Sequence, residues 1–183
     1  MALLHTPEKG DNMSAPDFTL KNIDGQMLSY ADVKGEKGTV IAFICNHCPY
    51  VHAIIKRFVH DVKNMQSHGI NVVCIMPNDT DNYPEDSFEN MQKFAEEHDF
   101  NFPYLIDKTQ EVAKAYDAIC TPDIFGFDGD GELEYRGRLD SAGANQADDT
   151  TVKELLRAML QIADTGVGPT NQSPSMGCSI KWK

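Results

Sequence analysis

Two cysteines that stand two residues apart are the side chains of this sequence best suited to chemistry. The segment Cys45–Cys48 (Cys-Asn-His-Cys) follows the apolar run Thr39–Ile44. At this spacing two thiols can form a reversible disulfide: one thiolate attacks a partner's disulfide, and the other thiol resolves the mixed disulfide that results. We predict that Cys45 is the attacking thiol and that Cys48 is the resolving thiol.

The residues beside the two thiols predict how the attacking thiolate is stabilised. Backbone amides at the N-terminus of a helix lower the pKa of a nearby thiol, and a protonated His47 between the cysteines lowers it further. A helix that begins only at Pro49 would leave more of the activation of Cys45 to His47, because a residue before proline disfavours helical geometry. The alternative is that His47 is an exposed histidine without a redox role.

A structural zinc site is the alternative interpretation of the same cysteines. Its ligands would be Cys45, Cys48 and His52, since His52 can share a helix face with Cys48. The sequence has no second Cys-x-x-Cys and no His-x-x-x-His pattern, so we expect neither a metal nor an organic cofactor.

Composition limits the class of protein. The chain has 183 residues, of which 41% are hydrophobic and 24% charged, and this is enough for one domain with a substantial core. Its formal net charge of -12 makes nucleic acids and anionic membranes poor partners. Residues 1–12 have no long apolar core, so we expect no signal peptide and a cytoplasmic protein. The odd number of cysteines, five, agrees with this.

Strands and helices are predicted to alternate around the cysteine segment. We expect strands near 18–20, 26–28, 40–45, 70–76, 103–106, 123–127 and 132–138, and helices after 49, over 88–98, over 110–116 and over 152–163. Strand 40–45, the helix after it and strand 70–76 form a unit with parallel strands. We divide the chain into an extension (1–13), a domain (14–163) and an extended tail (164–183), whose Ile180 and Trp182 suggest a docked end.

This order of elements resembles the thioredoxin-like superfamily, in the branch that joins membrane-tethered thiol reductases with the alkyl hydroperoxide reductase and thiol-specific antioxidant proteins. More closely, the chain resembles bacterial redoxin-domain proteins. The likeness is carried by Cys45–Val51 (CNHCPYV), Cys120–Asp123 (CTPD) and Gly177–Lys183 (GCSIKWK). It implies an α/β, thioredoxin-like fold with an N-terminal β-hairpin, a central αβα insertion and three α/β/α layers.

The resemblance also implies roles for residues outside the first motif. A cis peptide bond before Pro122 would face the Cys-x-x-Cys segment and expose the backbone of Thr121 as an edge for a substrate strand. The alternative is a proline in an ordinary turn. Cys120 and Cys178 could form a second redox pair or relay electrons to the first. The alternatives are a small buried side chain for Cys120 and an exposed thiol for Cys178.

Acidic residues in two places could have further roles. The group Asp79, Asp81, Glu85 and Asp86 lacks the spacing of a calcium loop, and we expect a solvated insertion there. Asp117 and Asp123 are plausible proton acceptors near the thiols.

Three functions remain open. A thiol-disulfide oxidoreductase would exchange disulfides with a partner protein that carries a disulfide or a dithiol, and would take electrons from another thiol system. A thiol-dependent peroxidase is the second. Peroxiredoxins carry Pro-x-x-x-Thr-x-x-Cys, but here Gly38 and Ala42 hold those places before Cys45, and Ile41 and Cys45 hold them before Cys48. The third is a metal- or partner-binding module without redox cycling.

Overall fold

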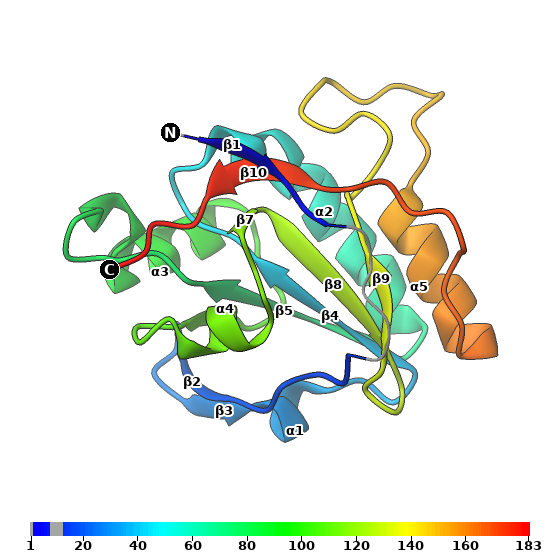
Figure 1. The fold of residues 1–183 in the computed structure, drawn as a ribbon, viewed down its shortest axis with the longest axis horizontal. Helices are drawn as coiled ribbons and strands as arrows, with labels where there is room; N and C mark the ends of the chain where they lie inside the picture. Colours follow the sequence, from blue (N-terminus) through cyan, green and yellow to red (C-terminus); the bar gives the residue numbers. More distant parts are fainter. Residues whose placement is uncertain (1, 8–12) are drawn as a thin grey trace.

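A seven-stranded mixed sheet forms the centre of the computed structural model, which describes residues 2–7 and 13–183 (Figure 1). Its strand order is β3-β2-β6-β5-β4-β8-β9. The strands are β2 (Thr19–Asn22), β3 (Met27–Ser29), β4 (Gly38–Phe43), β5 (Ile70–Met76), β6 (Tyr104–Ile106), β8 (Asp123–Asp128) and β9 (Leu133–Arg136). The pair β4–β5 is parallel, as the sequence predicted, and β2–β3 forms the expected N-terminal hairpin.

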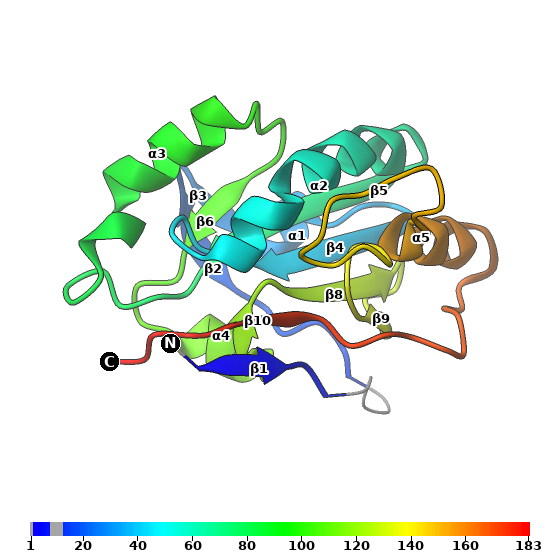
Figure 2. The same ribbon diagram turned by 90° about the horizontal axis from the view of Figure 1, so that it is seen from above.

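Helices cover both faces of this sheet, which gives three layers (Figure 2). One face carries α2 (Pro49–Ser67), α3 (Phe88–Glu97) and α5 (Glu154–Thr165), and the other carries α4 (Glu111–Ala115). Every residue of β4 is buried, because both faces of the strand are covered. The short helix α1 (Tyr30–Val33) adds Val33 to the core on the side of α4. The α/β architecture expected from the sequence is confirmed.

A second, three-stranded sheet joins the two ends of the chain. Its order is β1 (Leu3–His5), β10 (Met176–Ser179) and β7 (Cys120–Thr121), all antiparallel. Figures 1 and 2 both show β1 and β10 side by side, and β10 also contacts α2. The end of the tail docks as expected, since Ile180 is buried, whereas Trp182 is partly exposed. The division into extension, domain and tail stays a prediction, and residues 1 and 8–12 of the extension lie outside the described residues.

The structure differs from two of the predictions near the cysteine segment. Strand β4 ends at Phe43 instead of Cys45, and α2 begins at Pro49, so that both cysteines lie in the connecting loop and Cys48 is the N-cap residue. The expectation of a solvated acidic insertion is wrong for two residues. Asp79 and Asp86 are 2% and 0% exposed, because the segment around the 3-10 helix Pro84–Asp86 folds back onto that loop. Within residues 2–7 and 13–183, no helix is long and apolar enough to cross a bilayer.

Candidate active site

Three sulfur atoms meet around the backbone and side chain of Thr121. Cys45 Sγ lies 3.2 Å from Thr121 Oγ1, and Cys48 Sγ lies 3.0 Å from the carbonyl oxygen of the same residue. Cys178 Sγ lies 3.1 Å from Cys48 Sγ. All three are free thiols and are buried. The structure therefore brings together the predicted Cys-x-x-Cys pair, Thr121 and one of the two auxiliary cysteines.

Cys48 is the sulfur best placed to carry a negative charge. The Cys45 thiol donates a hydrogen bond to it, and the Cys178 thiol and the backbone amide of Val51 add to the effect, so the pKa of Cys48 falls to about 4 although burial opposes the charge. The carbonyl of Thr121 also opposes it, since it accepts a hydrogen bond from Cys48 only while that thiol is protonated. With the backbone amide of Cys178, four donors outweigh one acceptor, and the position of Cys48 at the start of α2 favours the anion.

Cys45 has the opposite environment. Its hydrogen bond to Cys48, its burial and the negative charge of Asp86 hold the pKa of Cys45 well above its usual range, and the Thr121 hydroxyl only partly offsets them. The motif predicted the reverse, with Cys45 as the ionised and attacking sulfur. That assignment stays a prediction. The hydrogen bond from Cys45 to Cys48 is the main physical reason for the difference, and the start of α2 at Pro49 adds to it by placing the amide of Val51 at Cys48.

A buried carboxylate organises the loop between the two cysteines. Asp86 accepts hydrogen bonds from the backbone amide of Asn46 at 2.8 Å and from Asn78 Nδ2 at 2.7 Å. His47 Nδ1 lies 2.8 Å from Asp86 Oδ2, and the His47 ring stacks on Tyr83 with a centroid distance of 6.0 Å. His47 is therefore held in place by the insertion. The sequence offered no signal for Asp86, since aspartate is buried only where partners satisfy it.

The candidate metal ligands in this structure differ from those predicted from the sequence. His52 Nε2 lies 2.7 Å from the carbonyl oxygen of Asn46, so the ring is engaged there. Among the described residues, Cys45, His47 and Asp86 form a group whose ligand atoms lie within 4.8 Å of one another. A thiolate, an imidazole and a carboxylate are ligands that zinc accepts. Here the carboxylate of Asp86 is already satisfied by nitrogen donors.

The Thr121–Pro122 peptide bond is cis, as the resemblance implied. The edge of Thr121 is not free for a substrate, however, because β10 pairs with it and places Cys178 directly opposite. Gly177 makes this possible: a Cβ atom there would lie 2.2 Å from the carbonyl oxygen of Thr121. The expectation of an open edge is thus wrong, as is the alternative of an exposed Cys178, which is 3% exposed.

Cys120, the second of the two auxiliary cysteines, and Asp123 both contact neighbouring groups of the fold. Cys120 Sγ lies 3.4 Å from the carbonyl oxygen of Pro122, and burial raises the pKa of Cys120 above its usual range. Asp123 forms an ion pair with Arg136, with Nη2 and Oδ2 2.9 Å apart, and accepts a bond from the amide of Ile119. This pair joins β8 to β9, and the charge of Asp123 adds to the rise in the pKa of Cys120.

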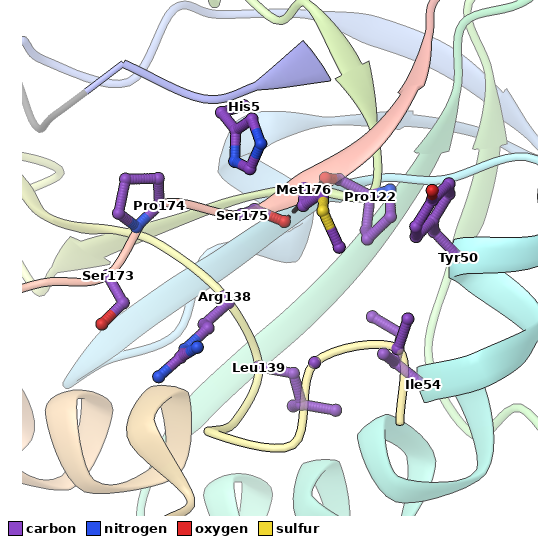
Figure 3. A pocket seen from close by; sticks show the side chains of 12 residues that line it. His5, Tyr50, Ile54, Pro122, Arg138, Leu139, Ser173, Pro174, Ser175 and Met176 are labelled. Atoms are coloured by element: carbon purple, nitrogen blue, oxygen red, sulfur yellow. Dashed lines mark hydrogen bonds between the residues drawn. The ribbon is translucent and has the colours of Figure 1, made fainter. Parts of the chain in front are cut away.

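A mostly apolar cavity of about 280 Å³ lies beside the cis-proline (Figure 3). Pro122, which follows β7, and Met176, the first residue of β10, line one side of it. Tyr50 and Ile54 line it from the first turns of α2. His5 reaches it from β1. The cavity offers space for an apolar side chain of a partner close to the covered thiols.

Comparison with known proteins fits this geometry. A solved structure from Geobacillus kaustophilus, described as an uncharacterized conserved protein, has 44% sequence identity and a TM-score of 0.93, and the match covers 100% of this chain and 97% of that one. The chain is also similar to "Thiol-disulfide oxidoreductase ResA" of Bacillus subtilis, with 24% identity over 123 residues, which are 67% of this chain and 64% of that protein.

A second curated relative is named as a peroxiredoxin and not as a thiol-disulfide oxidoreductase. The chain is 29% identical over 112 residues to "Putative peroxiredoxin MT2597" of Mycobacterium tuberculosis, and the match covers 61% of this chain and 66% of that protein. The matched part spans less than two thirds of the length of either curated relative. The AhpC/TSA family matches residues 12–136, which include the Cys-x-x-Cys loop and the cis-proline. The fold is thioredoxin-like, and the chain belongs to the AhpC/TSA family.

Proposed function

We propose that this protein is a thiol-disulfide oxidoreductase that cycles Cys45 and Cys48 between dithiol and disulfide through a mixed disulfide with a partner protein. The observation that carries the proposal is the meeting of two thiols at Thr121, with Cys45 Sγ at its hydroxyl and Cys48 Sγ at its carbonyl oxygen, in surroundings that favour a thiolate on Cys48. Such a pair can attack a disulfide and then resolve the product. The relatives named as thiol-disulfide oxidoreductases support the same chemistry.

The charges favour an order of events in which Cys48 attacks first. Its thiolate breaks the partner's disulfide and forms a mixed disulfide, and the partner's second sulfur leaves as a thiolate. Cys45 then attacks Cys48 Sγ, and its proton can pass to the group formed by His47 and Asp86, whose ligand atoms lie within 4.8 Å of Cys45 Sγ. The partner leaves as a dithiol, and the Cys45–Cys48 disulfide needs a thiol electron donor. A cytoplasmic location stays a prediction.

The first experiment is a redox titration of the whole chain. The protein is equilibrated in glutathione buffers of graded potential, its free thiols are alkylated, and each cysteine is mapped by mass spectrometry. We expect a reversible couple that involves Cys45 and Cys48. A midpoint near about -270 mV would indicate a reductant and one toward about -120 mV an oxidant. If both thiols stay reduced at every potential, the proposal fails, and bound zinc in the purified protein would then favour the metal-binding module.

The attacking sulfur is identified by trapping with insulin as the model disulfide protein. The variant C45S/C178S leaves only Cys48 in the cluster, and the variant C48S/C178S leaves only Cys45. We expect the first variant to accumulate the mixed disulfide. If the second variant accumulates it instead, Cys45 attacks first, as the motif predicted.

A thiol-dependent peroxidase is the second candidate, and the relative named as a peroxiredoxin supports it. A Cys48 thiolate could reduce peroxide and become a sulfenic acid, which a neighbouring thiol would resolve with loss of water. The C45S/C178S variant treated with hydrogen peroxide separates the two activities. A sulfenic acid that forms on Cys48 faster than the mixed disulfide with insulin would favour the peroxidase.

A further inference from the structure

The C-terminal strand lies where an extended substrate segment would pair. Strand β10 runs antiparallel to β7, with Cys178 opposite Thr121 and Ser179 opposite Cys120. Addition of a strand to a free sheet edge is a common way of binding extended peptides, because the backbone supplies the hydrogen bonds and the side chains supply the specificity. Here the chain's own tail occupies that edge and presents a cysteine to the thiols.

The tail is built into the site instead of lying loosely over it. On its other side β10 pairs with β1, and the amide of Ile180 donates to the carbonyl of Ile119 at 3.1 Å. Ser175 Oγ donates to the carbonyl of Pro122 at 2.9 Å, just before the strand begins. Gly177 gives the backbone its close approach to Thr121. These contacts fix the position of Cys178.

The distance between the sulfurs suits a covalent bond. Cys178 Sγ and Cys48 Sγ lie 3.1 Å apart and both are buried. A disulfide has an S–S length of about 2.05 Å, so a relative movement of about 1 Å joins the two atoms. Two thiols are therefore within reach of Cys48 Sγ: that of Cys45 from the same loop and that of Cys178 from the tail.

We propose that Cys178 is a third redox-active thiol, presented by β10 as a built-in substrate strand, and that it takes over the disulfide from Cys45 by bonding to Cys48. This inference rests on the proposed Cys45–Cys48 couple. The Cys178 thiolate attacks Cys48 Sγ of the Cys45–Cys48 disulfide. The bond between Cys48 and Cys178 forms, the bond between Cys45 and Cys48 breaks, and Cys45 leaves with the electron pair and receives the proton that Cys178 gave up. The exchange transfers no net electrons.

The electrostatics of the reduced and oxidised clusters favour this direction of attack. In the reduced protein, burial and the neighbouring Cys48 raise the pKa of Cys178 to about 12, so Cys178 keeps its proton. Formation of the Cys45–Cys48 disulfide removes the charge of Cys48, and the pKa of Cys178 should therefore fall. The positive charge of Lys181 continues to favour the Cys178 thiolate. Oxidation of the first pair thus prepares the third thiol.

The product would close the site. A Cys48–Cys178 disulfide ties β10 to the start of α2, so an external strand could not reach the backbone of Thr121. Cys45 would be a free thiol beneath this cover. Reduction of the bond would free the tail to move aside for a partner.

The test uses the full chain with Cys45→Ser, in which Cys48 and Cys178 are the only thiols of the cluster. Oxidation with glutathione disulfide should first attach glutathione to Cys48, and Cys178 should then displace it. Peptide mapping without reductant should find Cys48–Cys178 in most molecules. In C45S/C178S the glutathione adduct should persist on Cys48. C45S/C74A is the matched control, since it removes a core thiol and should retain the new disulfide.

The outcomes separate this inference from the proposed function. If glutathione persists on Cys48 in C45S while the wild type forms Cys45–Cys48, the third thiol is not redox-active and the inference is overturned alone. If Cys178→Ser, which keeps only Cys45 and Cys48 in the cluster, forms no disulfide between these two thiols, the proposed function fails. Peptide mapping of the partly oxidised wild type tests the inference without any substitution. We expect peptides joined by Cys45–Cys48 and peptides joined by Cys48–Cys178. A bond of Cys178 only to Cys45 or Cys120 would contradict the assignment.

Discussion

The two segments that carry the contacting sulfurs reach the site by different means. The Cys45–Cys48 loop is local: β4 delivers it, α2 continues from it, and the core on both sides of β4 fixes both elements. Cys178 comes from 130 residues further along the chain and is held mainly by backbone pairing to two strands of two and three residues, β7 and β1. The loop supplies the chemistry, and the tail controls access to it.

Reactivity and access are thus encoded mainly in different segments. The unequal pKa values of the two loop thiols depend first on their mutual hydrogen bond and on Asp86, and the tail adds a smaller contribution through the thiol and the backbone amide of Cys178. The burial of the same thiols depends on β10, which a short and separate part of the sequence provides. Substitutions in one segment should therefore change one property more than the other.

The largest effect is expected from removal of the sulfur that both segments share. Cys48→Ser should reduce disulfide exchange with insulin to the uncatalysed background, because neither Cys45 nor Cys178 retains a partner sulfur at contact distance. Cys178→Ser should leave the Cys45–Cys48 couple able to form. The rate of insulin reduction and the disulfide map of both variants test this. Equal loss of activity in the two variants would show that the loop alone does not supply the chemistry.

A change in the tail should act on access first. Gly177→Val places a side chain against the backbone of Thr121, where a Cβ would come within 2.2 Å of an oxygen atom. Overpacking of this kind costs about 1–3 kcal/mol, or about 2–12 °C in Tm for a chain of this size. We expect β10 to detach and the alkylation of Cys48 in the native protein to accelerate.

Ser179→Val on the same strand is the control for that substitution, because valine suits a strand and Ser179 does not approach Thr121 as Gly177 does. Native-state alkylation with mass mapping measures the outcome for both variants. If Gly177→Val leaves Cys48 as protected as in the wild type, the tail does not control access.

A change in the loop should act on ionisation first. In the wild type, Cys48 has a pKa of about 4, so its thiolate persists as the pH falls until that value is passed. Cys45→Ala removes the largest stabilising contribution, the hydrogen bond from Cys45, and should move the pKa of Cys48 up toward that of an ordinary thiol, about 8.5. The thiolate of the variant should therefore disappear at a higher pH.

Ultraviolet absorbance of the thiolate across a pH titration checks this shift, with Cys74→Ala as the control that removes a thiol outside the cluster. A wild type that titrates near pH 9, or a Cys45→Ala variant that titrates with the wild type, would contradict the assignment of the charge to Cys48.

The local segment could be predicted from the sequence, and the long-range contact could not. The apolar run before Cys45, the apolar stripe after Pro49 and the next strand at Ile70–Met76 each carry a periodicity long enough to recognise. By contrast, β7 has two residues and β1 has three, too few for any pattern. The motif around Cys178 indicated a resemblance, but pairing with Thr121 is a tertiary property. The burial of Asp86 was missed because it depends on the backbone amide of Asn46, 40 residues earlier in the chain, as well as on Asn78.

The smallest effect is expected at the very end of the tail. Trp182 is 42% exposed and its ring lies 5.6 Å from Lys114 Nζ, a contact worth about 0.5–1 kcal/mol at such a site. Ile180 is 3% exposed and packs into the core on the side of α4, where truncation to alanine costs about 2–5 kcal/mol. Trp182→Ala should thus leave the Tm and the protection of Cys48 almost unchanged, whereas Ile180→Ala should lower both. Thermal unfolding and native-state alkylation of the two variants measure the difference. If Trp182→Ala exposes Cys48 as much as Ile180→Ala does, the exposed end of the tail also holds β10 in place, and control of access extends beyond the paired strand.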